Sequence, residues 1–117
     1  MEKTKLVIES NTLNYDNAFL QQLVLSNGYY TVRISCKNLK VRKEKGTLTK
    51  ENISVNATPH NDLCAPVISG TGIGQLISFN KVMVSSKEDL ELVKECIAAA
   101  EDTMEQIDGL IEQYFLN

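Results

Sequence analysis

The chain has 117 residues, of which 43% are hydrophobic, so we expect one domain that buries a core without disulfide staples and is not disordered. No apolar run approaches the ~18 residues of a membrane span, and neither a signal peptide nor a membrane helix is expected. The net charge of −3 divides into +4 for residues 1–85 (ten basic, six acidic) and −7 for residues 86–117 (two basic, nine acidic), and an acidic surface argues against nucleic-acid binding there.

A helical pattern follows a first short strand, which is predicted over residues 5–9. Over residues 17–26, apolar side chains recur three and four positions apart. Asp16 can cap the first turn, and Asn27 followed by Gly28 is a typical helix stop. We therefore predict one short helix over residues 17–26, with Phe19, Leu20, Leu23 and Val24 as its apolar residues.

From Tyr29 onward the apolar period changes to two, which predicts a half-buried strand. Its inward residues are Tyr30, Val32, Ile34 and Cys36. Residues 39–42 alternate in the same way, so we predict a second strand and a hairpin whose two-residue turn is Lys37–Asn38.

This predicted hairpin creates a candidate anion site. It sets Arg33 opposite Arg42 on the outer face, which also carries Lys40, and directly opposed like charges are unfavourable. An anion should therefore lie near them. A ligand phosphate is one answer, because guanidinium donors match phosphate geometry, and Tyr29 and Thr31 would then add a stacking ring and a hydroxyl. The acidic C-terminal helix of the chain is the other answer.

Further strands are predicted around Ile53, Val55 and Ala57 and over residues 76–84, separated by a loop at 59–66. The glycines between them, Gly70, Gly72 and Gly74, could present backbone amides to a ligand. They lack the spacing of a dinucleotide-binding loop and the lysine of a Walker loop, so a flexible turn or a strand bulge is the alternative.

His60 lies near Asp62 and Cys64 in the loop and is the weakest candidate for catalysis, because no nucleophile motif accompanies it. A surface loop is the alternative. One histidine cannot supply a multi-histidine metal site. The three cysteines are widely spaced and odd in number, so we expect small core residues in a reducing compartment rather than disulfides or zinc ligands.

Residues 86–117 carry the strongest pattern, an apolar stripe with alternating spacings of 3 and 4 behind a capping box at Ser85 or Ser86. A continuous helix there would be ~46 Å long, against ~31 Å for a globule of 85 residues. We therefore predict that a second chain covers part of the stripe. The alternative is a break at Gly109 and folding back onto the same chain. The predicted interface residues are Ile97, Met104, Ile107, Ile111, Tyr114 and Phe115.

The layout of the chain, a basic sheet body with GYYTVR at residues 28–33 followed by a long helix starting at Ser86, resembles the small phage proteins of the Thoeris anti-defence sponge family. The resemblance covers most of the chain as an arrangement of elements. It implies a non-enzymatic homo-oligomer that sequesters cyclic ADP-ribose-type signals made by bacterial immune TIR enzymes, in pockets formed with the partner subunit.

The sequence thus predicts a single α+β domain: an antiparallel sheet with one short helix in residues 1–85, and a long amphipathic helix over 86–117. We hypothesise a cytoplasmic, phage-encoded homo-oligomer that binds a small anionic nucleotide-derived signal without turnover, cofactor or metal. Arg33, Arg42 and Lys40 would hold the ligand. The rival hypothesis is a protein–protein adaptor or assembly factor whose long helix docks on a partner. A hydrolase that uses His60 is the third.

Overall fold

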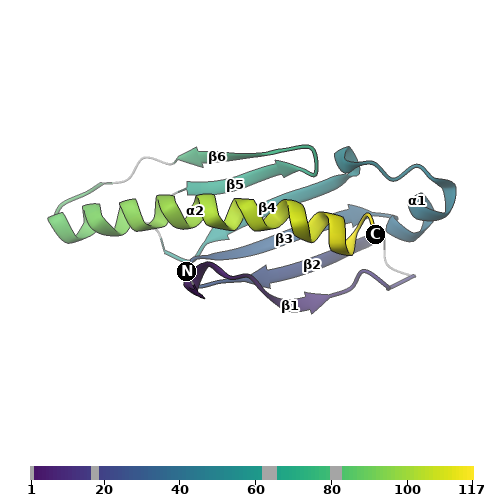
Figure 1. Ribbon diagram of the computed structural model, residues 1–117, viewed down its shortest axis with the longest axis horizontal. Coiled ribbons are helices and arrows are strands. Elements are labelled where there is room, and N and C mark those ends of the chain that lie inside the picture. The colour runs from purple at the N-terminus through teal and green to yellow at the C-terminus, as the bar shows by residue number, and fades with distance from the viewer. Residues whose placement is uncertain (1, 17–18, 62–65, 80–82) are drawn as a thin grey trace.

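An antiparallel β-sheet carries one long helix across one of its faces (Figure 1). This computed structural model describes residues 2–16, 19–61, 66–79 and 83–117. Within them the sheet has six strands in the order β1-β2-β3-β4-β5-β6, and the predicted α+β layout with one short and one long helix is confirmed. The elements are η1 (Glu2–Thr4), β1 (Val7–Asn11), β2 (Leu20–Ser26), β3 (Tyr30–Lys37), α1 (Leu39–Lys45), η2 (Lys50–Asn52), β4 (Ile53–Pro59), β5 (Pro66–Thr71), β6 (Gln75–Phe79) and α2 (Lys87–Tyr114).

The helix predicted over residues 17–26 is wrong. From Leu20 the segment is strand β2, and residues 17–18 lie outside the described part of the chain. Gln21, Leu23 and Leu25 are buried while the residues between them are more exposed, which is a period of two. Over so few residues the helical spacing and the strand period both fit, and pairing with β1 and β3 decides between them.

Asn27 builds the turn between β2 and β3 instead of ending a helix. Its Oδ1 accepts hydrogen bonds from the N–H groups of Tyr29 and Tyr30, each at 2.8 Å. Its Nδ2 donates to the Thr4 carbonyl at 2.9 Å and to Thr103 Oγ1 at 2.8 Å. One amide side chain therefore shapes the turn and joins it to η1 and α2.

Strand β3 confirms the predicted alternation, since its burial alternates residue by residue from Tyr30. The hairpin predicted after it is wrong, because residues 39–45 form helix α1. Asn38 takes a left-handed conformation (φ 53°) that turns the chain out of the sheet, and Gly46 ends α1 at φ 67°. The alternation of residues 39–42 was too short to exclude a helix.

The strand predicted around Ile53, Val55 and Ala57 is confirmed as β4, and the strand predicted over residues 76–84 is present as β6. The sequence predicts no strand where β5 lies, and the glycine-rich stretch is the turn of the β5–β6 hairpin. Gly70 has φ +152°, and a Cβ there would lie 2.3 Å from the Gly74 carbonyl oxygen. Only glycine fits this close approach. The strand predicted to 84 ends at Phe79; residues 80–82 lie outside the described part, and 83–84 are not strand.

Helix α2 is continuous through Gly109, as predicted, and at 28 residues it is about 42 Å long. Its start matches the second capping alternative, because Ser86 Oγ accepts from the Asp89 N–H at 3.1 Å. Its buried side is Cys96, Ala99, Ala100, Thr103, Ile107 and Ile111. These residues pack on the inner side chains of the sheet, which include Leu23, Leu25, Val32, Ile34, Ile53, Val55, Ala57 and Ile68.

The chain's own core therefore buries three of the six residues predicted to face a second chain. Ile107, Ile111 and Phe115 are at most 1% exposed within the monomer, so the interface prediction is wrong for these three. Ile97, Met104 and Tyr114 are half-buried. A helix of about 42 Å fits on one chain because the molecule is elongated, 54 × 22 × 21 Å, and the strands run lengthwise beneath the C-terminal part of α2 (Figure 1).

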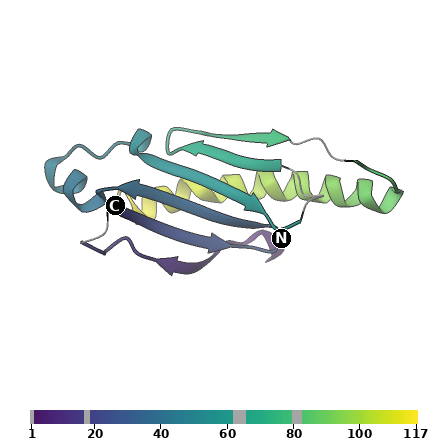
Figure 2. The same ribbon diagram turned by 180° about the vertical axis from the view of Figure 1, so that it is seen from behind.

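The opposite face of the sheet has no described helix over it (Figure 2). Its central side chains are short and polar around one arginine: Thr31, Arg33, Ser35, Ser54, Asn56 and Thr58. An antiparallel sheet with one covered face has this apolar-in, polar-out pattern. None of the described helices is long and apolar enough to cross a membrane.

Two of the three cysteines lie in the described part of the chain, and both are buried. Cys36 is a free thiol whose pKa is raised by burial, with Arg42 acting in the opposite direction. Cys96 is disulfide-bonded, which corrects the prediction that the cysteines are only small core residues. Cys64 lies outside the described residues.

Candidate functional site

The two arginines predicted to face each other lie in different elements. Arg33 is on the open face of β3, between Val24 of β2 and Asn56 of β4. Arg42 lies in α1, and its Nε donates to the Lys37 carbonyl oxygen at 2.9 Å. Because α1 replaces the predicted hairpin, the argument that opposed arginines need an anion no longer holds.

Tyr29 and Thr31 have other partners. Tyr29 is 7% exposed and its hydroxyl donates to Glu95 of α2. That hydrogen bond, then burial and the charge of Glu95, raise the pKa of Tyr29. Thr31 lies on the open face, where its Oγ1 is 2.7 Å from Nε2 of His60. The ring of Tyr29 is therefore part of the contact between sheet and helix, rather than a free stacking surface.

The backbone amides of the glycine-rich turn, residues 70–74, are largely occupied. The Thr71 N–H donates to the carbonyl of residue 74 at 3.1 Å, and the Gly72 N–H donates to the carbonyls of Lys50 and Ile53, both at 2.9 Å. A Cβ on Gly72 would lie 2.7 Å from the Lys50 carbonyl oxygen. The glycine at 72 thus serves a close backbone contact with η2, and these amides form no anion cradle.

His60 is exposed and contacts Thr31, while its predicted neighbours Asp62 and Cys64 lie outside the described residues. Within the described part of the chain, no group of three or more histidine, cysteine or acidic side chains could hold a metal ion. The predicted grouping of His60 with Asp62 and Cys64 therefore stays a prediction.

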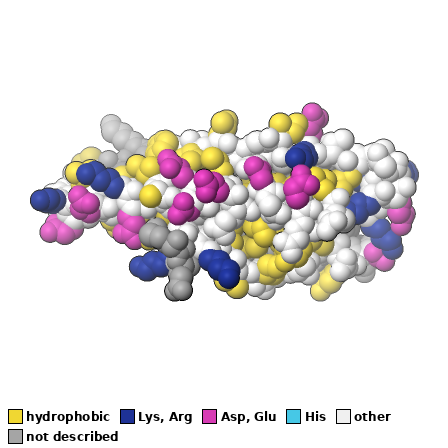
Figure 3. Space-filling model, in the orientation of Figure 1, with side chains coloured by type: hydrophobic (Ala, Val, Ile, Leu, Met, Phe, Trp, Pro, Cys, Tyr) yellow, Lys and Arg dark blue, Asp and Glu magenta, His cyan; other side chains and the backbone are white. Residues whose placement is uncertain are grey.

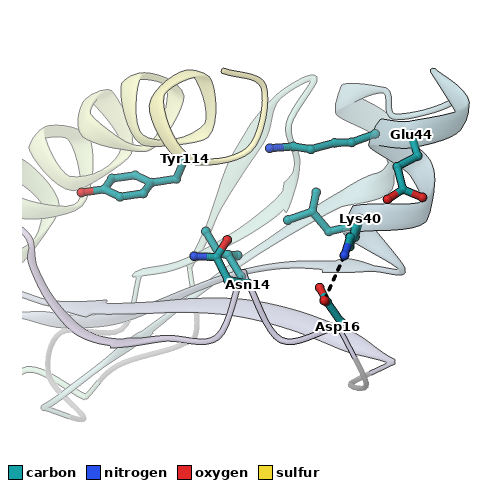
Figure 4. A pocket seen from close by; sticks show the side chains of 8 residues that line it. Asn14, Asp16, Lys40, Glu44 and Tyr114 are labelled. Carbon is teal, nitrogen blue, oxygen red and sulfur yellow. Dashed lines mark hydrogen bonds and ion pairs between the residues drawn. The ribbon is translucent and has the colours of Figure 1, made fainter.

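A pocket of about 330 Å³ lies where α1, the segment after β1 and the last turn of α2 meet (Figure 4). Figure 4 shows Lys40 and Tyr114 on different sides of this space, with Asn14 and Asp16 on the segment after β1. Its volume falls at the lower end of the range for small-molecule sites. Its lining residues are Leu13, Asn14, Asp16, Leu39, Lys40, Lys43, Glu44 and Tyr114.

A buried amide fixes the frame of this pocket. Gln21 of β2 is 2% exposed; its Nε2 donates to the Tyr15 carbonyl at 3.0 Å, and its Oε1 accepts from the Leu39 N–H at 2.8 Å. The first N–H group of α1, which has no partner within the helix, is thereby satisfied. Gln21 therefore ties the segment after β1 to the start of α1, the two walls that carry Asp16 and Lys40.

The two ammonium groups of the pocket differ in their partners. Lys40 Nζ lies 2.9 Å from Asp16 Oδ2, and that hydrogen bond, with the charges of Asp16 and Glu44, raises the pKa of Lys40. Among the ion pairs of the described residues, none involves Lys43. Lys43 therefore offers a cation whose charge no side chain in the described part of the chain neutralises directly.

Lys43 also lines a second hollow of about 340 Å³ on the same helix. Arg42, Leu48, Leu116 and Asn117 line it together with Lys43. Helix α1 as a whole carries four basic residues and one acidic residue. The end of the molecule at α1 is thus basic, whereas the outward side of α2 is acidic (Figure 3).

The pocket combines chemical features that suit a small anionic molecule with a planar ring. Leu13 and Leu39 supply apolar contact, the half-buried ring of Tyr114 supplies a flat surface, and Asn14 offers an amide. Lys43 can donate charge-assisted hydrogen bonds to phosphate or carboxylate oxygens. Its described lining includes no serine, cysteine or histidine.

Sequence reasoning found part of this site and missed the rest. The sequence predicts that Lys40 holds a ligand, but beside Arg33 rather than beside Asp16. It does not point to Lys43 or Asn14, and it places Tyr114 in an interface. The run of basic residues from 37 to 45 was a usable signal, because four of them fall within one short helix. No local pattern could show that α2 ends beside them.

Comparison of the chain with family models, with curated proteins and with solved structures finds no match. We therefore infer function from the geometry of the pocket and from the chemistry of its side chains.

Proposed function

We propose that this protein is a non-enzymatic binding protein that holds a small anionic, ring-bearing ligand, of the nucleotide-derived class, in the pocket between α1 and the end of α2. The observation that carries the proposal is the position of Lys43, an ammonium without an ion-pair partner among the described residues, in a pocket that also has the Tyr114 ring and an apolar floor.

The wider form of the proposal adopts the resemblance to the phage sponge family. In that form the ligand is a cyclic ADP-ribose-type signal, and the protein sequesters it in the cytoplasm of an infected bacterium and so counters immunity. Of the residues first expected to bind it, Lys40 lines the pocket and Arg42 lines the adjacent hollow. Arg33, Tyr29, Thr31 and the glycines of residues 70–74 do not line either space.

Calorimetric titration of the purified chain tests this proposal. Cyclic ADP-ribose, ADP-ribose, AMP and pyrophosphate are the probes, with adenosine as the uncharged comparison. We expect a phosphate-bearing probe to bind and adenosine to bind at least about tenfold more weakly, because a charge-assisted hydrogen bond contributes about 1.5–3 kcal/mol. Lys43→Ala should weaken binding by the same factor.

Lys45→Ala is the matched control. Lys45 lies on the same short helix with the same charge but lines neither hollow, so its substitution should leave the affinity within about twofold. No binding of any phosphate-bearing probe, or equal losses for the two lysine variants, would contradict the proposal. Equal losses would mean that the basic residues attract the probe only through the overall positive charge of α1 and not through a contact in the pocket.

A second function has one observation in its favour. The exposed acidic residues of α2 are Glu88, Glu91, Glu95, Glu101, Glu105, Asp108 and Glu112, and only two of them form a side-chain ion pair among the described residues. An unneutralised acidic helix suits an adaptor that docks on a basic protein surface. Charge reversal of Glu101 and Glu105 should then abolish capture of such a partner while leaving the Kd for the phosphate probes unchanged.

A further inference from the structure

The two edges of the sheet are built differently. At one edge, β1 has an irregular register between Ile8 and Ser10, and Glu9 accepts a hydrogen bond from Ser26 at 2.5 Å. A bulge and an edge charge both discourage pairing with another chain. At the other edge, β6 contains no charged residue and no proline, and its register against β5 is regular. The edge at β6 therefore has none of the devices that protect β1.

The ladder of the β5–β6 hairpin shows which backbone groups this edge presents. The Thr71 N–H donates to the Gly74 carbonyl, so hydrogen-bonded pairs alternate along the strands from that point. By this alternation Pro66 and Phe79 are opposite each other without backbone hydrogen bonds between them, which fits the missing N–H of proline. The N–H and C=O groups of Gln75, Ile77 and Phe79 therefore point away from β5.

Large apolar side chains border the same edge. Leu76 is 74% exposed, Phe79 is 62% exposed and Ile73, in the turn before β6, is 66% exposed. The segment from Pro66 to Phe79 contains no charged residue, although 23% of the chain is charged. An uncharged edge with outward backbone groups and exposed apolar side chains is suited to receive another strand.

We propose that the partner of β6 is β6 of a second copy of this chain, paired antiparallel so that the two sheets become one. Charge selects this partner, because a strand that pairs with itself places each of its charges beside a like charge, and β6 has none. An acidic peptide would find no basic residue on 66–79 and would meet Glu105 and Asp108 beside the edge, and a basic peptide would find its counter-charge only on those α2 residues, not on β6. With a two-fold axis at Ile77, the outward N–H and C=O groups of Ile77 face Ile77 of the second copy, and those of residues 75 and 79 face residues 79 and 75 of that copy.

In this arrangement the two copies meet at the sheet edge, whereas the sequence predicted that they meet along the C-terminal helix. The α2 helices of the two copies lie on the same face of the joined sheet, because the two-fold axis runs perpendicular to it. Glu105 and Asp108 line a hollow with Gly74 and Gln75, so the acidic sides of both helices face the axis. Repulsion between them weakens pairing, and salt screens that repulsion. The dimer should therefore tighten as ionic strength rises.

Sedimentation equilibrium of the full chain tests the proposal. A five-residue edge is short compared with a standard interface, so we expect a dimer that forms in the micromolar range, with a mass approaching twice 13.0 kDa. Its dissociation constant should fall by about threefold or more between 50 mM and 500 mM NaCl. A chain that stays monomeric, or one that dissociates as salt is added, overturns the proposal.

Two variants locate the interface at β6. Leu76→Lys places a charge on a side chain that is already exposed, and Phe79→Pro removes an outward N–H without removing a ladder bond to β5. Each should raise the dissociation constant at least tenfold with the thermal midpoint of the monomer nearly unchanged. Val7→Lys is the matched control on the β1 edge, where Val7 is 61% exposed. A dimer that survives both β6 variants, or is lost in the control, contradicts pairing at β6.

Discussion

At the scale of single residues, Tyr30 shows how one polar atom is accommodated in an apolar core. Its side chain is 0% exposed, and its hydroxyl donates to the Pro66 carbonyl at 2.6 Å. Burial disfavours the phenolate and raises the pKa of Tyr30 to about 12. The hydrogen bond joins the start of β3 to the start of β5, two strands that are not neighbours in the sheet.

We predict that this tyrosine makes the protein sensitive to alkaline pH. Since the pKa is about 12 in the folded chain and 10.0 in the reference state, the folded form retains the proton more strongly. The corresponding stability is fully present below pH 10 and is lost as pH rises through about 12. Chemical denaturation at pH 8 and pH 11 measures the difference.

Tyr30→Phe is the companion variant. It should cost about 1–2 kcal/mol at pH 8, because the buried Pro66 carbonyl loses its donor. It should also lose less stability than the natural chain between pH 8 and pH 11. If the two proteins lose equal stability over that interval, Tyr30 is not the group that titrates.

Residue-level expectations succeeded where the pattern was long and failed where it was short. The alternation from Tyr30 to Cys36 spans a whole strand and correctly gave its buried side. The alternation at 39–42 spans four residues and belongs to a helix. The role of Asn27 could not be read from the sequence, because its partners Thr4 and Thr103 are remote in the chain.

At the scale of elements, α2 is the best-predicted part of the fold. Its apolar stripe, a cap at Ser85 or Ser86 and its continuity through Gly109 followed from the sequence, and the structure places the cap at Ser86. What covers the stripe did not follow, because spacing shows that a face is buried and not which chain buries it. The candidate pocket has the same limit, since α1 and Tyr114 come together only through the length and path of α2.

Gly109 gives a test of the helix itself. It is exposed, and a Cβ at this position would find no atom within 4 Å. Gly109→Ala should therefore stabilise the chain by about 0.5–1 kcal/mol, through the lower entropy of the unfolded backbone and the better helix propensity of alanine. Thermal unfolding should show a midpoint raised by about 2–6 °C.

Gly70→Ala is the opposing control, because its Cβ would meet the Gly74 carbonyl at 2.3 Å with φ at +152°. That variant should lower the midpoint. A Gly109→Ala chain that is no more stable than the natural one would mean that α2 is not helical at this position in solution.

At the scale of the whole molecule, the acidic α2 and the basic α1 are separate charged regions of an elongated body with a radius of gyration of 15.6 Å.

The redox state of the cysteines bears on the compartment in which the protein works. The disulfide at Cys96 is a feature of oxidising environments, whereas the proposed sequestration of a signal takes place in a reducing cytoplasm. The number of free thiols separates these two conditions.

We predict that the chain, purified without reductant and unfolded in guanidinium chloride, presents fewer than three reactive thiols, because Cys96 is in a disulfide. In the folded chain Cys36 should react slowly, since it is 1% exposed and burial raises the pKa of its thiol. Three rapidly reacting thiols in the unfolded chain would contradict the disulfide and favour a cytoplasmic protein.

The unfolding of the molecule depends on the single helical layer that α2 forms on the sheet. Among the described α-helices, only α2 packs along the apolar side of the sheet, so undocking α2 would expose most of that side to water at once (Figure 1). A partly opened chain would gain little entropy from the freed helix while exposing many aliphatic groups to water. Loss of the last quarter of the chain, by cleavage or by a premature stop, should therefore leave an aggregating remnant rather than a smaller working protein.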